Sequence, residues 1–175
     1  MIKLGADING QIVINKDIYN KIFDGQNYSI YSNSITLFFN KSVYNLTIKN
    51  IKINSTANGI IFYDKSDNVT IINCTILGGI LSFNNLSNLK IVNNNFTSFD
   101  FFGDSNQLYI KNNNYNDISF YGNTKNQLVL DNIGDFRAFG KCSNITLIYG
   151  VSKSLEFFDD CKNISIKNYY FNKKL

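Results

Sequence analysis

The charged side chains that could do chemistry recur at one position in the second half of the chain. The segments FDFF, ISFY, FRAF and LEFF begin 18 or 19 residues apart, and their second residues are Asp100, Ser119, Arg137 and Glu156. If the first and third residues of each segment point into a core, these four lie on one outer face. They could act on a ligand or pair with one another. We expect pairing, with an exposed Arg137–Glu156 ion pair that contributes at most about 1 kcal/mol.

Other carboxylates lie close to these segments. Asp104 and Asp135 flank two of them, and Asp159 and Asp160 follow LEFF directly. A turn after a strand is an ordinary place for aspartate, which hydrogen-bonds to nearby backbone. We therefore expect no catalytic residue here. The candidates, should the protein be an enzyme, are Asp100, Arg137, Glu156, Asp159 and Asp160.

A repeat of about 20 residues determines where these positions fall. Each copy opens with a polar amide residue followed by an apolar, any and an apolar residue, as in NVTI and NLKI. The opening residues are Asn27, Asn45, Asn68, Asn88, Gln107, Gln127, Asn144 and Asn163. This alternation of branched and polar side chains predicts strands, and no segment keeps a helical period for long. Stacked coils would pair the strands in parallel, about 4.8 Å apart.

The stacking predicts two interior columns and one corner column. The first interior column is Leu46, Val69, Leu89, Leu108, Leu128, Ile145 and Ile164. The second is Ile48, Ile71, Ile91, Ile110, Leu130, Leu147 and Ile166. Asparagine then recurs at Asn50, Asn73, Asn93, Asn112, Asn132 and Asn168. Because asparagine tolerates the left-handed backbone of a tight corner and stacked amides can bond from coil to coil, we predict an asparagine ladder.

This repeat resembles the right-handed parallel β-helix of the pectate-lyase-like superfamily, whose coils carry an asparagine ladder. The resemblance covers about residues 11–171. It implies an all-β, single-stranded solenoid of about seven to eight coils of about 19–20 residues, with an N-terminal cap. The alternative is a four-sided pentapeptide-repeat helix. Counting in fives from Leu89 reaches Asn94, Phe99 and Asp104, so that register fails after one coil.

The resemblance also frames the possible chemistry. Lyases of this superfamily hold calcium with acidic side chains near an arginine or lysine base, and its hydrolases use clustered aspartates with a histidine. The chain has no histidine, and its copies from Leu89 onward carry almost no inserted loops that could build a cleft. We therefore expect a non-catalytic structural or adhesive module without a cofactor. The alternative is a polysaccharide lyase-like enzyme, for which calcium would be the cofactor, or a lectin.

An aromatic residue closes the last strand of each copy. These residues are Tyr63, Phe83, Phe102, Tyr121, Phe139 and Phe158. If the chain turns inward there, the rings stack in the core, which is the arrangement we expect. If the strand instead continues its alternation, they form an exposed stripe suited to sugars or to a partner chain.

Two of the three cysteines share one position in the repeat. Cys142 and Cys161 lie two residues before Asn144 and Asn163. Stacking would place their Cα atoms about 4.8 Å apart, within the disulfide range. Because neighbouring parallel strands point their Cβ atoms the same way, we expect two reduced thiols, with a disulfide as the alternative. Cys74 should pair with neither.

One domain should span residues 1–175, with a cap at 1–23, coils at 24–171 and a tail at 172–175. In the cap, the charged segment NKDIYNKIFD interrupts the repeat and keeps Ile14, Ile18, Ile22 and Phe23 for the core. We expect the last coil to be covered by another subunit or protected by Lys173 and Lys174.

The charge and the hydropathy of the chain argue against two classes of partner, nucleic acids and membranes. The net charge of +4 comes mostly from scattered lysines, so we expect no nucleic acid, and no apolar run is long enough for membrane insertion. The N-terminus lacks the apolar block of a secretory signal. Partners should be copies of the chain or another structural protein, and glycans are a further possibility. We expect a component of a virion, a fibre or the cell surface.

Overall fold

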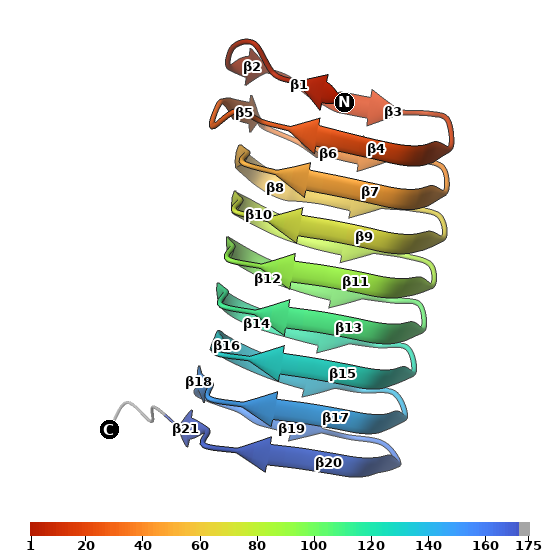
Figure 1. Ribbon diagram of the computed structural model, residues 1–175, viewed down its shortest axis with the longest axis vertical. Coiled ribbons are helices and arrows are strands. Elements are labelled where there is room, and N and C mark those ends of the chain that lie inside the picture. The colour runs from red at the N-terminus through yellow and green to blue at the C-terminus, as the bar shows by residue number, and fades with distance from the viewer. Residues whose placement is uncertain (172–175) are drawn as a thin grey trace.

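The computed structural model describes residues 1–171, and all regular secondary structure in that range is β-strand. The coils stack into a rod of about nine turns that wind right-handedly (Figure 1). The resemblance therefore predicted the solenoid correctly but gave one or two coils too few. Within residues 1–171, no helix is long and apolar enough to cross a membrane. The predicted tail at 172–175, with Lys173 and Lys174, lies outside the described residues.

Nine parallel strands form the first sheet, in chain order along the rod. They are β1 (Ile2–Lys3), β4 (Ile18–Asp24), β7 (Val43–Lys49), β9 (Ser66–Ile72), β11 (Leu86–Val92), β13 (Ser105–Lys111), β15 (Thr124–Leu130), β17 (Cys142–Ile148) and β20 (Cys161–Lys167). From β7 to β17, buried and more exposed side chains alternate along most of each strand, which buries one face of the sheet.

Twelve parallel strands form the second sheet, which closes the other sides of each coil. Nine follow one another along the rod: β2 (Ile8–Asn9), β5 (Ser29–Ser32), β8 (Lys52–Phe62), β10 (Thr75–Ser82), β12 (Asn95–Phe101), β14 (Asn114–Phe120), β16 (Ile133–Ala138), β18 (Val151–Ser152) and β21 (Tyr170–Phe171). The others are β3 (Ile12–Ile14), β6 (Leu37–Phe39) and β19 (Leu155–Phe157). The long strand β8 pairs with β5 through its first half and with β6 through its second.

A residue with positive φ bends each strand of the first sheet from β4 onward. These residues have φ of 52–56° and are Asn20, Asn45, Asn68, Asn88, Gln107, Asn126, Asn144 and Asn163. Two of the predicted opening residues were therefore wrong. Asn20 takes the place predicted for Asn27, and Asn126 the place predicted for Gln127. The pairing of the strands gives the second correction, because Gln127 pairs with Leu108 and Asn126 therefore stands level with Gln107, a glutamine that also adopts the left-handed region.

The corrected register changes what fills the core in β15. Gln127 and Val129 point inward, paired in register with residues of β13 and β17, while Leu128 and Leu130 are half-buried on the outer side. Gln127 is 2% exposed in a column otherwise made of aliphatic side chains over the central coils. The interior columns predicted with Leu128 and Leu130 are therefore wrong at this coil.

The asparagine ladder exists, but its buried part lies one residue further along the chain than predicted. Asn94, Asn113 and Asn132 are buried, and Asn94 Nδ2 donates to Asn113 Oδ1 (3.0 Å) and Asn113 Nδ2 to Asn132 Oδ1 (2.9 Å). Of the predicted ladder, only Asn132 belongs to this column. The residues before it in each coil have φ of 51–57° and turn the corner: Asn50, Asn73, Asn93, Asn112, Asp131, Tyr149 and Asn168.

Residues 1–23, predicted as a cap, form the first strands of the two sheets. β1 and β4 are the first two strands of the first sheet, and β4 pairs in register with β7. Ile18 and Phe23 are buried, whereas Ile14 and Ile22 are only partly so. An exposed lysine, Lys21, pairs with Leu46 of the next coil at the position where most later coils have a buried aliphatic residue.

Cys142 and Cys161 form a disulfide, with Cα atoms 4.4 Å apart. The expected reduced pair is therefore wrong. The two residues face each other in the register of β17 and β20, so stacking alone brings them within bonding distance. Cys74 is free, as predicted. It is also buried, and burial raises the pKa of its thiol to about 11.

Candidate functional site

Arg137 lies at the centre of a group of carboxylates on the outer face of the second sheet. Its guanidinium contacts Glu156 (Nε–Oε2 3.7 Å), Asp117 (Nη1–Oδ2 3.4 Å) and Asp135 (Nη2–Oδ2 3.9 Å). The pairing with Glu156 confirms the prediction from the repeat. The contacts with Asp117 and Asp135 were not predicted, because these residues stand two positions before the recurring charged column.

Asp100 lies on the same face, two coils before Arg137, because Asp100 pairs with Ser119 and Ser119 pairs with Arg137. Burial raises the pKa of its carboxyl, and the nearby charge of Asp117 raises it further. The hydroxyl of Ser98, which donates to Asp100 Oδ2 (3.4 Å), and the charge of Arg137 act in the opposite direction but do not cancel the rise. A carboxyl with a raised pKa is the kind of group that can serve as a general acid.

The other carboxylates near these segments accept hydrogen bonds at turns or pair with a lysine, and Asp135 does so while it also contacts Arg137. Asp135 Oδ1 accepts hydrogen bonds from the backbone N–H groups of Lys153 (2.7 Å) and Ser154 (3.1 Å). Asp159 accepts one from the backbone of Asp160, and Asp160 pairs with Lys162 (3.1 Å). Asp104 accepts one from the backbone of Asn123 (2.9 Å). The six carboxylates and the arginine at these positions therefore do not converge on one cavity, and no three metal-binding side chains of residues 1–171 gather to hold an ion.

A small hollow of about 330 Å³ lies beside Arg137 and is also lined by Tyr115, Asp117 and Lys153. The side chain of Tyr115 is 5% exposed, and its hydroxyl has no hydrogen-bond partner. Burial, with smaller contributions from Tyr169 and Asp135, raises the pKa of Tyr115 well above its usual value. Its ring passes over Gly134, where a Cβ atom would clash with the ring.

The aromatic column lies outside, along the edge of the rod. We call Tyr63, Phe83, Phe102, Tyr121, Phe139 and Phe158 the aromatic ridge. Five of the rings are 43–59% exposed, and Phe139 is half-buried. The expected burial is wrong because the strand alternation continues through the fourth position of each segment. The third position points inward instead, where Phe101 and Phe120 stack at 4.5 Å.

The rings of the ridge stack on one another from coil to coil. Neighbouring centroids from Phe83 to Phe158 are 4.7–5.3 Å apart, with interplanar angles of 5–11°. Tyr63 continues the row at 5.7 Å, tilted by 53°. Since each ring face covers the next, the inner rings of the stack present mainly their edges to solvent.

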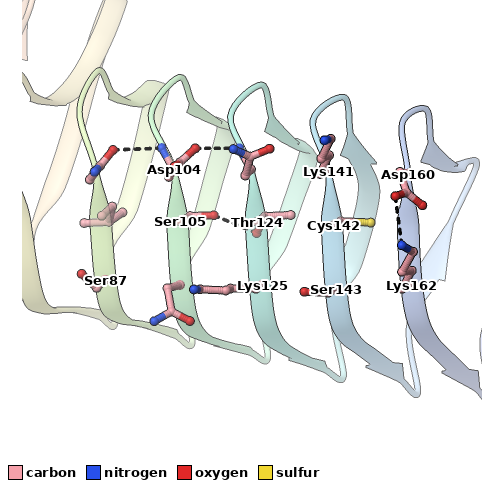
Figure 2. Close-up of a pocket in the computed structure, with 14 residues that line it drawn as sticks. Ser87, Asp104, Ser105, Thr124, Lys125, Lys141, Cys142, Ser143, Asp160 and Lys162 are labelled. Atoms are coloured by element: carbon pink, nitrogen blue, oxygen red, sulfur yellow. Dashed lines mark hydrogen bonds and ion pairs between the residues drawn. The ribbon is translucent and has the colours of Figure 1, made fainter.

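A polar groove of about 520 Å³ runs beside the ridge across five coils (Figure 2). One row of lining side chains stands at the corner and includes Asp104, Lys141 and Asp160, and a second row on the strands includes Lys125 and Lys162. Hydrogen bonds connect coils within it: Asp104 N donates to Asn85 Oδ1 (3.1 Å) and Ser105 Oγ to Thr124 Oγ1 (2.8 Å).

The groove was missed in the sequence, although a signal for it exists. Each lining residue of the corner row stands two positions after a ridge aromatic, as Asp104 follows Phe102 and Lys141 follows Phe139. The residues of the corner row differ in type from coil to coil, so no single residue type marks this position in the sequence. Aligning the copies of the repeat on the ridge aromatics would have shown that these residues stack in one row.

No protein-family model matches this chain, and neither a curated protein nor a solved structure matches it. The similarity to the pectate-lyase-like superfamily therefore rests on the parallel β-solenoid and its amide ladder alone. A fold shared by proteins of unrelated activity does not assign a reaction.

Proposed function

We propose that this chain is a non-catalytic structural or adhesive module, a component of a virion, fibre or cell surface, that makes contacts through the side of its rod. The observation that carries the proposal is the aromatic ridge. Six rings of about 150–250 Å² each, about half exposed, present roughly 500–600 Å² of aromatic surface in one line. Contiguous exposed apolar surface of this size is typical of contact sites.

The geometry of the ridge favours a protein partner. Sugars stack on the faces of aromatic rings, and within the ridge most faces already lie against the next ring. Ring edges instead suit packing against other apolar side chains, including other ring edges. The contact would therefore be with a copy of this chain or with another structural protein.

The Arg137 group supports a structural rather than a catalytic role. Three carboxylates surround the positively charged guanidinium of Arg137. An arginine so neutralised is poorly placed to act as a base or to bind an acidic substrate. The short corners between coils also leave few segments from which a deep cleft could be built.

The Cys142–Cys161 disulfide supports a location in an oxidising environment. Disulfides persist outside the reducing cytosol, for example at the cell surface or in virions. This agrees with the setting expected for an adhesive or structural rod.

The polar groove favours a second candidate function, binding of glycans in the manner of a lectin. Its rows of amide, hydroxyl and lysine side chains repeat at the spacing of the coils, so a linear polysaccharide could meet similar donors and acceptors along the rod. The lysines would favour acidic sugars. A polysaccharide lyase-like enzyme is the catalytic form of this alternative.

Surface binding tests the proposal. The full chain is passed over immobilised copies of itself and over neutral and acidic polysaccharides, with and without calcium. We expect binding that a Phe102→Ser, Tyr121→Ser variant loses and that the matched control, Tyr31→Ser with Tyr149→Ser, keeps, since those tyrosines are exposed away from the ridge. Absence of binding to every probe, or release of unsaturated sugars, would overturn the proposal.

A further inference from the structure

Two residues that line the hollow beside Arg137 carry buried hydroxyl groups without a hydrogen-bond partner. Tyr115 is 5% exposed and Ser152 is 4% exposed, and neither Tyr115 Oη nor Ser152 Oγ meets a partner within residues 1–171. Burial raises the pKa of Tyr115, so its hydroxyl keeps its proton and remains a donor. Because an unpaired buried hydroxyl costs stability, a molecule bound in the hollow would explain why both are kept.

Gly134 accounts for the hollow in this part of the rod. The register of β14, β16 and β18 places Tyr115, Gly134 and Ser152 in one inward column. Earlier coils fill the same column with Ile76 and Phe96. At Gly134 the column has no side chain, the ring of Tyr115 leans over the gap, and all three residues line the hollow.

The charges that line the hollow cancel. Asp117 and Asp135 are negative, whereas Arg137 and Lys153 are positive. Glu156 contacts Arg137 without lining the hollow and leaves the group slightly negative, which argues against an acidic ligand. A cationic ligand would find no free carboxylate, because Asp117 and Asp135 both contact Arg137 and Asp135 also accepts the N–H of Lys153. A neutral, polar ligand fits this lining best.

We propose that the hollow binds one neutral sugar residue, free or at the end of a glycan, whose hydroxyl groups pair with those of Tyr115 and Ser152. A hydroxyl both donates and accepts, so each of these pairs can form in either direction. Ile133 and Val151 add apolar surface for the C–H groups of the sugar ring. The volume of about 330 Å³ lies at the small end of the range for ligand pockets, which suits a single residue.

The site goes beyond the structural or adhesive role proposed above and does not depend on the aromatic ridge. Neither hydroxyl touches solvent in the free chain, so the Tyr115 and Ser152 side chains turn toward the hollow as the sugar enters. The charged side chains around the opening are already paired with one another. They can donate to and accept from sugar hydroxyls without a change in net charge.

Saturation-transfer NMR on the full chain tests the ligand class. The probes are glucose, galactose and mannose, with glucuronate as the acidic sugar and glucosamine as the cationic one. We expect saturation of at least one neutral hexose and none of glucuronate. No saturation of any neutral hexose, or stronger saturation of a charged sugar, would overturn the proposal.

Oligosaccharides of the hexose that binds distinguish the two sources of the sugar. Saturation confined to the terminal residue identifies the end of a glycan, and binding of the free hexose alone identifies a monosaccharide. Equal saturation along the whole oligosaccharide would contradict a site that holds one residue.

Removal of single hydroxyls separates binding from folding. Tyr115→Phe deletes an unpaired buried group, so we expect a higher melting temperature together with an affinity for the sugar about tenfold weaker. Ser152→Ala should change both quantities in the same directions. The matched control is Tyr169→Phe, because the Tyr169 hydroxyl is also buried without a partner within residues 1–171 but Tyr169 does not line the hollow. This control should melt higher and bind the sugar unchanged.

Two results with Tyr115→Phe would overturn the proposal. An unchanged affinity would show that the hydroxyl does not contact the sugar. A lower melting temperature would show that the hydroxyl is already satisfied in the free chain, for example by a bound water.

Failure of this site can be told apart from failure of the proposed function. The ridge variant Phe102→Ser, Tyr121→Ser should bind the sugar as the native chain does, since neither residue lines the hollow. Binding that this variant keeps and Tyr115→Phe weakens belongs to the hollow. Binding that the ridge variant loses and Tyr115→Phe keeps belongs to the ridge.

Discussion

Gln127 is the one amide among the aliphatic side chains of its interior column. It is 2% exposed, its Nε2 donates to the hydroxyl of Thr124, and its Oε1 has no hydrogen-bond partner. A buried acceptor without a partner costs about 1–3 kcal/mol. The residue therefore destabilises the coil in which it sits, while the Ser105 hydroxyl still donates to Thr124 without it.

Replacing Gln127 with leucine should stabilise the protein. Leucine matches the neighbouring Leu108 and Ile145 and removes the unpaired oxygen, so we expect a gain of about 1 kcal/mol in the free energy of unfolding. Denaturant titration measures it, with Gln11→Leu at an exposed position as the control. A loss of stability would show that the amide is better satisfied than its contacts indicate.

The raised pKa of Asp100 makes its effect on stability depend on pH. The folded protein binds the proton of this carboxyl more tightly than the unfolded chain, so its contribution to stability falls as pH rises through the raised value. Asp100→Asn should therefore raise the melting temperature at pH 7. The difference from the native chain should vanish well below pH 4, the usual range of an aspartate. An equal gain at both pH values would point to a cause other than ionisation.

At the scale of strands and corners, the sequence predicts which segments form strands better than it predicts their register. The alternation of apolar residues located most strands of the first sheet. Runs such as Asn93, Asn94 and Asn95 offer three amides where one turns the corner and the next is buried, so composition could not place the ladder. The adjacent amides Asn126 and Gln127 likewise put the predicted register of β15 off by one residue. The ridge was expected in the core because the sequence does not show whether the chain turns inward at the aromatic residue or continues its alternation past it.

The strands β17 and β20 are held together by the Cys142–Cys161 disulfide as well as by their ladder. In the chain-entropy model, a bridge that closes a loop of about 19 residues stabilises by about 3 kcal/mol. Replacing both cysteines with serine should lower the free energy of unfolding by about this amount, and Cys74→Ala should leave the bridge intact. Thiol counting on the denatured, unreduced protein should find one free thiol. Three would show that the bridge does not form.

At the scale of the whole molecule, the terminal coils cover the ends of a continuous core. Removing residues 1–24 takes away β1 to β4 and leaves β7 as an edge strand with Leu46 and Ile48 uncovered. We expect the shortened chain to aggregate and to lose its cooperative thermal transition. A soluble product that melts cooperatively would mean that the later coils need no cover at this end.

Because the disulfide lies near the C-terminal end of the described rod, we expect the rod to unfold from its N-terminal end first. Each layer of a solenoid is held by its neighbours, so the layers peel from the ends, and each end can peel independently. The covalent tie between β17 and β20 prevents the last two layers from separating, whereas β1 pairs with β4 through two residues only. Under mechanical load or protease attack, the described part of the rod should unravel from the first coils toward the bridge, and the stapled coils should be the last to yield.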